Sequence, residues 1–103
     1  MTNVYVELDG GRCLLELEGH ATGSREVCAA VSGLVCSLAG YLANCEREGT
    51  AEVYLLDLRP GHVCIHASGD ERVTGACEMA VLGLRQMERQ WPELVRVQWT
   101  EEL

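Results

Sequence analysis

Hydrophobic and polar residues alternate near the N-terminus of the chain. From Asn3 to Leu8 the apolar Val4 and Val6 occupy every second position, and the same alternation resumes from Arg12 to Glu18. Between them lies Asp9-Gly10-Gly11, whose residues tolerate positive φ angles. Alternation with period two is typical of a strand with one buried face. The pattern therefore predicts a β-hairpin.

Two later segments have the helical period instead. In the first, Ser24 to Glu48, apolar residues recur three or four positions apart, and Gly49 follows as a stop signal. These residues are Val27, Val31, Leu34, Val35, Leu38 and Leu42. The second segment, Glu71 to Gln90, also carries an apolar stripe, and Pro92 blocks its continuation. Two helices are predicted, the second ending near Trp91.

The remaining segments read as strands. Ala51 to Leu58 and His62 to Ser68 flank Arg59-Pro60-Gly61, a proline-glycine turn, which predicts a second hairpin. Glu93 to Thr100 is predicted to be a last strand. The element order becomes β-β-α-β-β-α-β, without a linker or low-complexity segment. We expect an α+β fold in a single domain over residues 1–103, a mixed sheet with two helices packed on it.

The charge balance narrows the choice of partners. Sixteen acidic residues face eight basic ones, all of them Arg, for a formal charge of −8. Such a chain repels phosphate backbones and anionic lipids, so a basic protein or peptide is the favoured partner, rather than nucleic acid or a membrane. The sequence contains no run of about 18 apolar residues and no N-terminal secretory pattern. The expected location is the cytoplasm.

Six cysteines are present, at positions 13, 28, 36, 45, 64 and 77. None forms a Cys-x-x-Cys pair, the spacing typical of structural zinc sites and dithiol redox motifs. Without a secretory signal they are expected to be free thiols, most of them small hydrophobic residues in the core. No metal or other cofactor is predicted.

A thiol near the start of the first predicted helix is the main candidate for chemistry. Ser24 is a good N-cap, which makes Cys28 the fourth helical residue, where the dipole and free amides favour a thiolate. His20 ends the preceding strand and could take the proton of this thiol as a general base. The backbone amides of Cys28 and Ala29 are candidates to hold an oxyanion.

Other interpretations of these residues stay open at this point. Cys28 could be a core thiol beside a surface imidazole. Ser32, one turn after Cys28, could orient a catalytic group or bond back to its own backbone. His62, Cys64 and His66 share one face of a predicted strand and form a rival metal site. However, same-face neighbours on a strand lie about 7 Å apart, and no fourth ligand is obvious.

The stretch from His20 to Ser32 also carries a resemblance. Gly19-His20-Ala21, Gly23 and Val27-Cys28-Ala29-Ala30-Val31-Ser32 closely resemble the signature of the ribosomal-processing cysteine protease family Prp. The run Glu78 to Leu84, followed by Trp91-Pro92-Glu93, is similar to the second helix of that family and its exit. In element order the resemblance covers nearly the whole chain.

The resemblance implies a cytosolic endopeptidase of bacterial or phage origin that acts as a homodimer. It makes Cys28 the nucleophile and His20 the base, with Ser32 in a supporting role beside the helix cap Ser24. It implies as substrate the short N-terminal extension of large-subunit ribosomal protein L-twenty-seven, cut after a pair of aromatic residues.

The chain departs from the family pattern at two places. Only Ala21 to Val27 separates His20 from Cys28, whereas the family commonly has a longer loop, and Arg25 stands where the family has Asp. Two alternatives follow. One is a diverged or phage-associated paralogue that cuts another protein, such as a capsid component. The other is a non-catalytic dimeric module that binds a basic partner.

Overall fold

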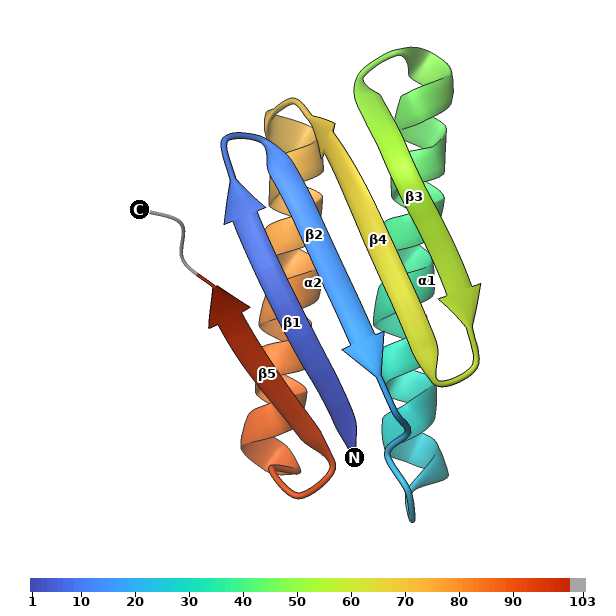
Figure 1. The fold of residues 1–103 in the computed structure, drawn as a ribbon, viewed down its shortest axis with the longest axis vertical. Coiled ribbons are helices and arrows are strands. Elements are labelled where there is room, and N and C mark those ends of the chain that lie inside the picture. The colour runs from blue at the N-terminus through green and yellow to red at the C-terminus, as the bar shows by residue number, and fades with distance from the viewer. Residues whose placement is uncertain (101–103) are drawn as a thin grey trace.

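One β-sheet and two α-helices make up the described part of the chain (Figure 1). The computed structural model describes residues 1–100. Their order confirms the predicted β-β-α-β-β-α-β arrangement. The elements are β1 (Thr2–Asp9), β2 (Arg12–Glu18), α1 (Arg25–Glu48), β3 (Ala51–Arg59), β4 (His62–Gly69), α2 (Glu71–Gln90) and β5 (Val95–Thr100).

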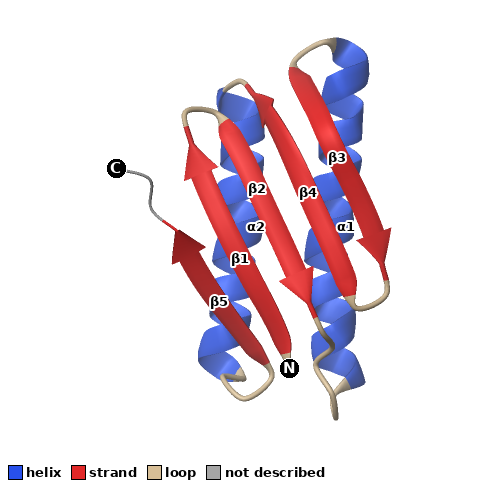
Figure 2. Cartoon of the chain, in the orientation of Figure 1, coloured by secondary structure: helices blue, strands red, loops and turns tan. Residues whose placement is uncertain are grey.

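The sheet is mixed, as predicted, with strand order β3-β4-β2-β1-β5. Both hairpins, β1 with β2 and β3 with β4, are antiparallel, and β2 pairs antiparallel with β4 at the centre. The last strand adds parallel to β1 at one edge. Figure 2 shows both helices on the same face of this sheet. The fold is therefore α+β, with its second sheet face uncovered.

The last strand starts later than its sequence pattern predicts. It begins at Val95 rather than Glu93, because the amides of Leu94 and Val95 both donate to the carbonyl of Trp91, at 2.9 and 3.0 Å. This turn closes α2 and reverses the chain. The carbonyl of Leu94 then accepts from Thr2, at 2.8 Å, so β1 also starts one residue earlier than expected.

The hydrophobic core fills the space between the helices and the covered sheet face. Alternate residues of the strands point into it, as the period-two pattern requires. Its largest fully buried members include Val4, Val6, Leu15, Leu42, Ile65, Val73, Val81 and Leu84. Cys13, Cys45 and Cys77 are buried there too, so half of the six thiols lie in the core rather than the expected majority.

Helix α1 is unusually apolar for its length. It has 24 residues, and an 18-residue window within it has a mean hydropathy of 1.6, so by length and composition it could cross a membrane, which the sequence pattern did not lead us to expect. Most of this hydropathy comes from the apolar stripe that packs on the sheet, while small residues, Ala, Gly and Ser, occupy much of the outward face. Core helices of soluble proteins meet the same criterion.

Candidate active site

The first turn of α1 is fixed by its cap. Ser24 is the N-cap, as predicted, and its hydroxyl oxygen accepts a hydrogen bond from the amide of Val27, at 3.2 Å. The same hydroxyl donates to the Glu26 carboxylate, at 3.3 Å. Cys28 is half-buried in this turn, and its thiol donates to the carbonyl of Ala21, at 3.6 Å. The sulfur thus lies against the connection that leads into the helix.

His20 lies two residues after the end of β2, where the chain leaves the sheet. The preceding Gly19 has φ 92°, and a Cβ there would collide with the carbonyl oxygen of Met1, so the close approach requires glycine. The amide of Gly19 donates to the carbonyl of Gly61 in the turn between β3 and β4, at 2.9 Å. The imidazole of His20 is exposed and lies beside that turn.

The connection between His20 and Cys28 is compact. The amide of Thr22 donates to the His20 carbonyl, at 2.9 Å, and the amide of Ser24 donates to the Ala21 carbonyl, at 3.2 Å. Ala21 is buried and ties the loop to the core. This segment therefore packs as a hydrogen-bonded turn between β2 and α1.

His20 and Cys28 line the same hollows. A cavity of about 60 Å³ between α1 and the end of β2 has His20, Cys28, Ser32, Gly61 and His62 among its walls. A wider cleft of about 340 Å³ is lined by the loop from His20 to Arg25 and by Cys28. Among residues 1–100, no hydrogen bond joins the His20 imidazole to the thiol. The fold thus brings His20 and Cys28 to the same cavity, but the two side chains are not hydrogen-bonded to each other.

The amides predicted to hold an oxyanion are engaged in the helix. The Cys28 amide donates to the Ser24 carbonyl, at 3.2 Å. Ala29 lies one residue further inside α1, where amides bond to the carbonyl four residues earlier. Their role as oxyanion donors stays a prediction. In the described chain the amides without a hydrogen bond at this end of the helix are those of Arg25 and Glu26.

Ser32 makes neither of the contacts considered for it. In the part of the chain that the structure describes, its hydroxyl has no hydrogen bond to a catalytic group or to its own helix. It is exposed and lines the small cavity with His20 and Cys28. Its supporting role stays a prediction.

The three residues of the rival metal site have other neighbours. His62 pairs with Glu18 through Nδ1, and its Nε2 lies 3.8 Å from Asp57 Oδ2. The ring of His66 packs against Tyr54, with centroids 4.9 Å apart. Within the described residues, no three His, Cys, Asp or Glu side chains are grouped to hold a metal ion.

The thiols differ in their surroundings. Burial, together with the carboxylates of Glu16, Asp57 and Glu18, raises the pKa of Cys64. A hydrogen bond to Cys77, with burial, raises the pKa of Cys13. Both effects favour protonated, unreactive thiols. Cys28 is also half-buried, but it lies in the first turn of α1 and lines a cavity with His20.

Sequence reasoning missed the contribution of the turn between β3 and β4. Gly61 and His62 line the cavity with the predicted pair, although they lie far from it along the chain. The proline-glycine pattern predicted the turn itself. Nothing in the local pattern indicated that this turn meets the end of β2, because that depends on the β2–β4 pairing.

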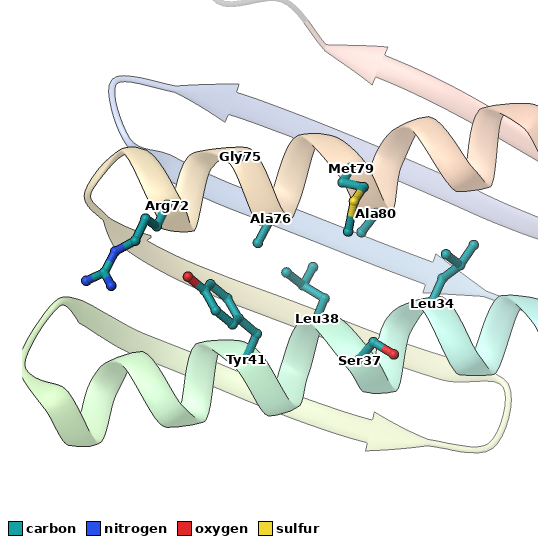
Figure 3. A pocket seen from close by; sticks show the side chains of 9 residues that line it. All are labelled: Leu34, Ser37, Leu38, Tyr41, Arg72, Gly75, Ala76, Met79 and Ala80. Carbon is teal, nitrogen blue, oxygen red and sulfur yellow. The ribbon is translucent and has the colours of Figure 1, made fainter.

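An apolar groove lies elsewhere on the molecule, away from His20 and Cys28. Figure 3 shows it between α1 and α2, with Leu38, Tyr41 and Ala76 turned toward the groove and Arg72 at one end. Its volume is about 470 Å³, and its lining contains no His, Cys or carboxylate. This groove therefore lacks the groups that peptide hydrolysis needs.

Several solved structures are similar to this fold. One similar solved structure is Prp from Staphylococcus aureus, an essential ribosomal processing protease, in complex with a covalently linked product peptide. The similarity covers 97% of this chain and 100% of that chain, with a TM-score of 0.76 and 17% sequence identity. The same protease with a substrate peptide gives a TM-score of 0.70 at 16% identity, with 97% and 100% of the two chains covered. A Streptococcus mutans protein is 25% identical over 99% of this chain and 96% of its own, with a TM-score of 0.71.

The family itself is shown by sequence. A search of curated proteins gave no match. A family model described as cysteine protease Prp, however, matches residues 1–96, nearly the whole chain. This match supports a peptidase over the non-catalytic binding module that the residues alone left open. The chain belongs to the family of cysteine protease Prp and is a cysteine peptidase.

Proposed function

We propose that Cys28 is the nucleophile of this peptidase and His20 its general base. The observation that carries the proposal is that both side chains line one cavity at the N-terminus of α1. Cys28 lies in the first turn of the helix, close to its positive end. His20 approaches from the end of β2, so the two groups come from elements that the sheet and core hold in place.

The chemistry follows from these two groups. His20 removes the proton of the Cys28 thiol, and the thiolate attacks the carbonyl carbon of the scissile peptide bond. The carbonyl oxygen becomes an oxyanion, and the C–N bond breaks as His20 returns the proton to the leaving amine. A water molecule, deprotonated by His20, then hydrolyses the thioester and releases the second product. The covalently linked product peptide of the similar S. aureus structure supports such a covalent route.

The thiol of Cys28 is already engaged before the proposed reaction begins. The thiol donates to the Ala21 carbonyl, and this bond must be released before His20 can take the proton. The unbonded amides of Arg25 and Glu26 are the nearest free donors of the helix for an oxyanion. Ser24 keeps these amides in place through its capping bond, and Ser32 is proposed to support the pair from the cavity wall.

The substrate that we propose is the N-terminal extension of ribosomal protein L-twenty-seven. Two similar solved structures are ribosomal processing proteases, one of them with a substrate peptide. The formal charge of −8 supports a basic partner such as the arm of a ribosomal protein. No cofactor enters the proposed reaction.

A second substrate class is favoured by the short connection before α1. Hydrogen bonds at Thr22 and Ser24 close this segment into a compact turn, so it has little length with which to cover a bound peptide. A paralogue that cuts a different protein, including one of phage origin, would fit this feature with the same catalytic pair. The cleavage test below separates the two.

We also propose a cytoplasmic homodimer. All six cysteines are free, which suits a reducing compartment. The outward helix face carries the apolar groove of Figure 3 and the exposed side chains of Met79 and Leu82. Large exposed apolar patches mark interaction sites, and a second copy would cover this one.

Cleavage of the ribosomal protein tests the proposed function. The protein with its extension is incubated with the wild type, Cys28→Ala and Cys64→Ala, and products are followed by mass spectrometry. Wild type and Cys64→Ala are expected to cut at comparable rates, whereas Cys28→Ala should be inactive because no other thiol lines the cavity with His20.

Cys64→Ala is the matched control, because Cys64 is half-buried like Cys28. It separates the loss of the nucleophile from the general effect of replacing a half-buried thiol. Activity of Cys28→Ala at the wild-type rate would end the proposal. An intact ribosomal protein, with another protein cut in a Cys28-dependent way, would favour the second substrate class.

A further inference from the structure

The turn between β3 and β4 leaves space for the His20 ring. Gly61, in this turn, has φ 76° and no side chain. A Cβ at this position would lie 2.6 Å from Nε2 of His20, 3.2 Å from Cε1 and 3.3 Å from Cδ2. Real Cβ atoms essentially never approach a heavy atom within 3.0 Å. The Nε2 edge of the imidazole therefore occupies space that only glycine leaves open.

Backbone contacts tie the same turn to the residues before His20. The Gly19 amide donates to the Gly61 carbonyl, at 2.9 Å. One residue further on each strand, Glu18 and His62 are direct partners in the β2–β4 register and pair through their side chains. The turn between β3 and β4 therefore contacts both the backbone that leads to His20 and the His20 ring.

We propose that Gly61 is a positioning residue that fixes the orientation of the His20 imidazole. With Nε2, Cε1 and Cδ2 against the turn, Nδ1 is the ring nitrogen left to exchange a proton with the Cys28 thiol. The effect of Gly61 on catalysis rests on the proposed role of His20 as base. The effect of Gly61 on the orientation of the His20 ring is independent of that role.

A matched control exists in the chain. Gly49 has φ 82°, and a Cβ there would meet nothing within 4 Å. Gly49→Ala therefore introduces the same backbone strain as Gly61→Ala, without the contact to an imidazole. At Gly61 the nearest atom belongs to the end of a flexible side chain, so the ring is expected to move while the hairpin persists. Gly61→Asn serves as a second variant, because Asn tolerates the left-handed region and brings the same Cβ.

The test combines NMR with thiol labelling. The ring signals of His20, assigned by their loss in His20→Ala, are compared in wild type, Gly61→Ala and Gly49→Ala. The rate of Cys28 alkylation is measured in the same proteins and in the double variant Gly61→Ala/His20→Ala. We expect Gly61→Ala to shift the His20 signals and to slow Cys28 by up to about 10²-fold, the effect of a misplacement of about 1 Å. Gly49→Ala should do neither.

The double variant shows whether Gly61 acts through His20. If it does, Gly61→Ala adds no further loss once the imidazole is gone. The inference is overturned if Gly61→Ala and Gly61→Asn leave the His20 signals where Gly49→Ala leaves them. It is also overturned if Gly61→Ala slows Cys28 equally with and without His20. Shifted signals, with a Cys28 rate that His20→Ala itself does not change, would uphold the positioning of the ring and reject His20 as the base.

Discussion

At the scale of single residues, the thiols of one small chain are made different by their neighbours. Cys13 and Cys64 have raised pKa values because burial, a hydrogen bond or nearby carboxylates disfavour their charged forms. Cys28 instead lies in the first turn of a helix, with an imidazole on the wall of the same cavity. Residue type alone could not rank these thiols.

The sequence could predict the catalytic candidates but not their hydrogen bonds. The sequence predicts His20 and Cys28 from a thiol at a helix start and a His close to a strand end, and their catalytic roles stay a prediction. The amides of Cys28 and Ala29 stay predicted oxyanion donors, and the structure shows the Cys28 amide bonded to the Ser24 carbonyl, at 3.2 Å. The cap at Ser24 was predicted correctly, so the unbonded amides of Arg25 and Glu26 could have been inferred from it.

At the scale of elements, the strength of local signals explains which bounds were predicted correctly. Helix α2 runs from Glu71 to Gln90 as expected, since Pro92 and the apolar stripe limit it from both directions. Strand β5 begins two residues late, because the turn after Trp91 depends on hydrogen bonds that no pattern specifies. The contact between the β3–β4 turn and His20 arises from strand pairing, which is non-local.

The cap of α1 allows a test at this scale. Ser24→Ala removes the acceptor of the Val27 amide, at 3.2 Å, so we expect the free energy of unfolding to fall by about 1 kcal/mol. Urea unfolding measures this change. Ser37→Ala, on the outward side of the same helix, is the control and should leave stability unchanged or slightly higher, because Ala is the better helix former. Equal stability of Ser24→Ala and wild type would show that the cap contributes nothing.

At the scale of the whole molecule, one layer of helices covers one face of the sheet and leaves its own outward face apolar. The groove between α1 and α2 and the exposed Met79 and Leu82 lie on that face. The sequence predicted two helices on a mixed sheet, and this is confirmed. It did not predict which helical residues stay exposed, because the crossing of the two helices decides that.

A charge on this face tests the proposed dimer. Leu82 is 56% exposed on α2, and Leu55 is 46% exposed on β3, on the uncovered side of the sheet. Leu82→Glu is expected to shift the protein from dimer to monomer in light scattering, since a buried unpaired carboxylate is strongly unfavourable at an interface. Leu55→Glu should leave the dimer intact. A wild-type monomer, or dissociation only by Leu55→Glu, would contradict the proposed interface.

The account depends most on an activated thiol at Cys28 that uses His20 as its base. The direct measurement is the rate of alkylation of Cys28 against Cys64 by mass spectrometry, as a function of pH, in wild type and His20→Ala. Both thiols are half-buried, and the raised pKa of Cys64 keeps it protonated at neutral pH, so its rate should rise only as the solution becomes alkaline. We predict that Cys28 reacts first at neutral pH and loses this lead in His20→Ala. Equal rates for the two thiols in wild type, or a Cys28 rate that His20→Ala leaves unchanged, would contradict the account.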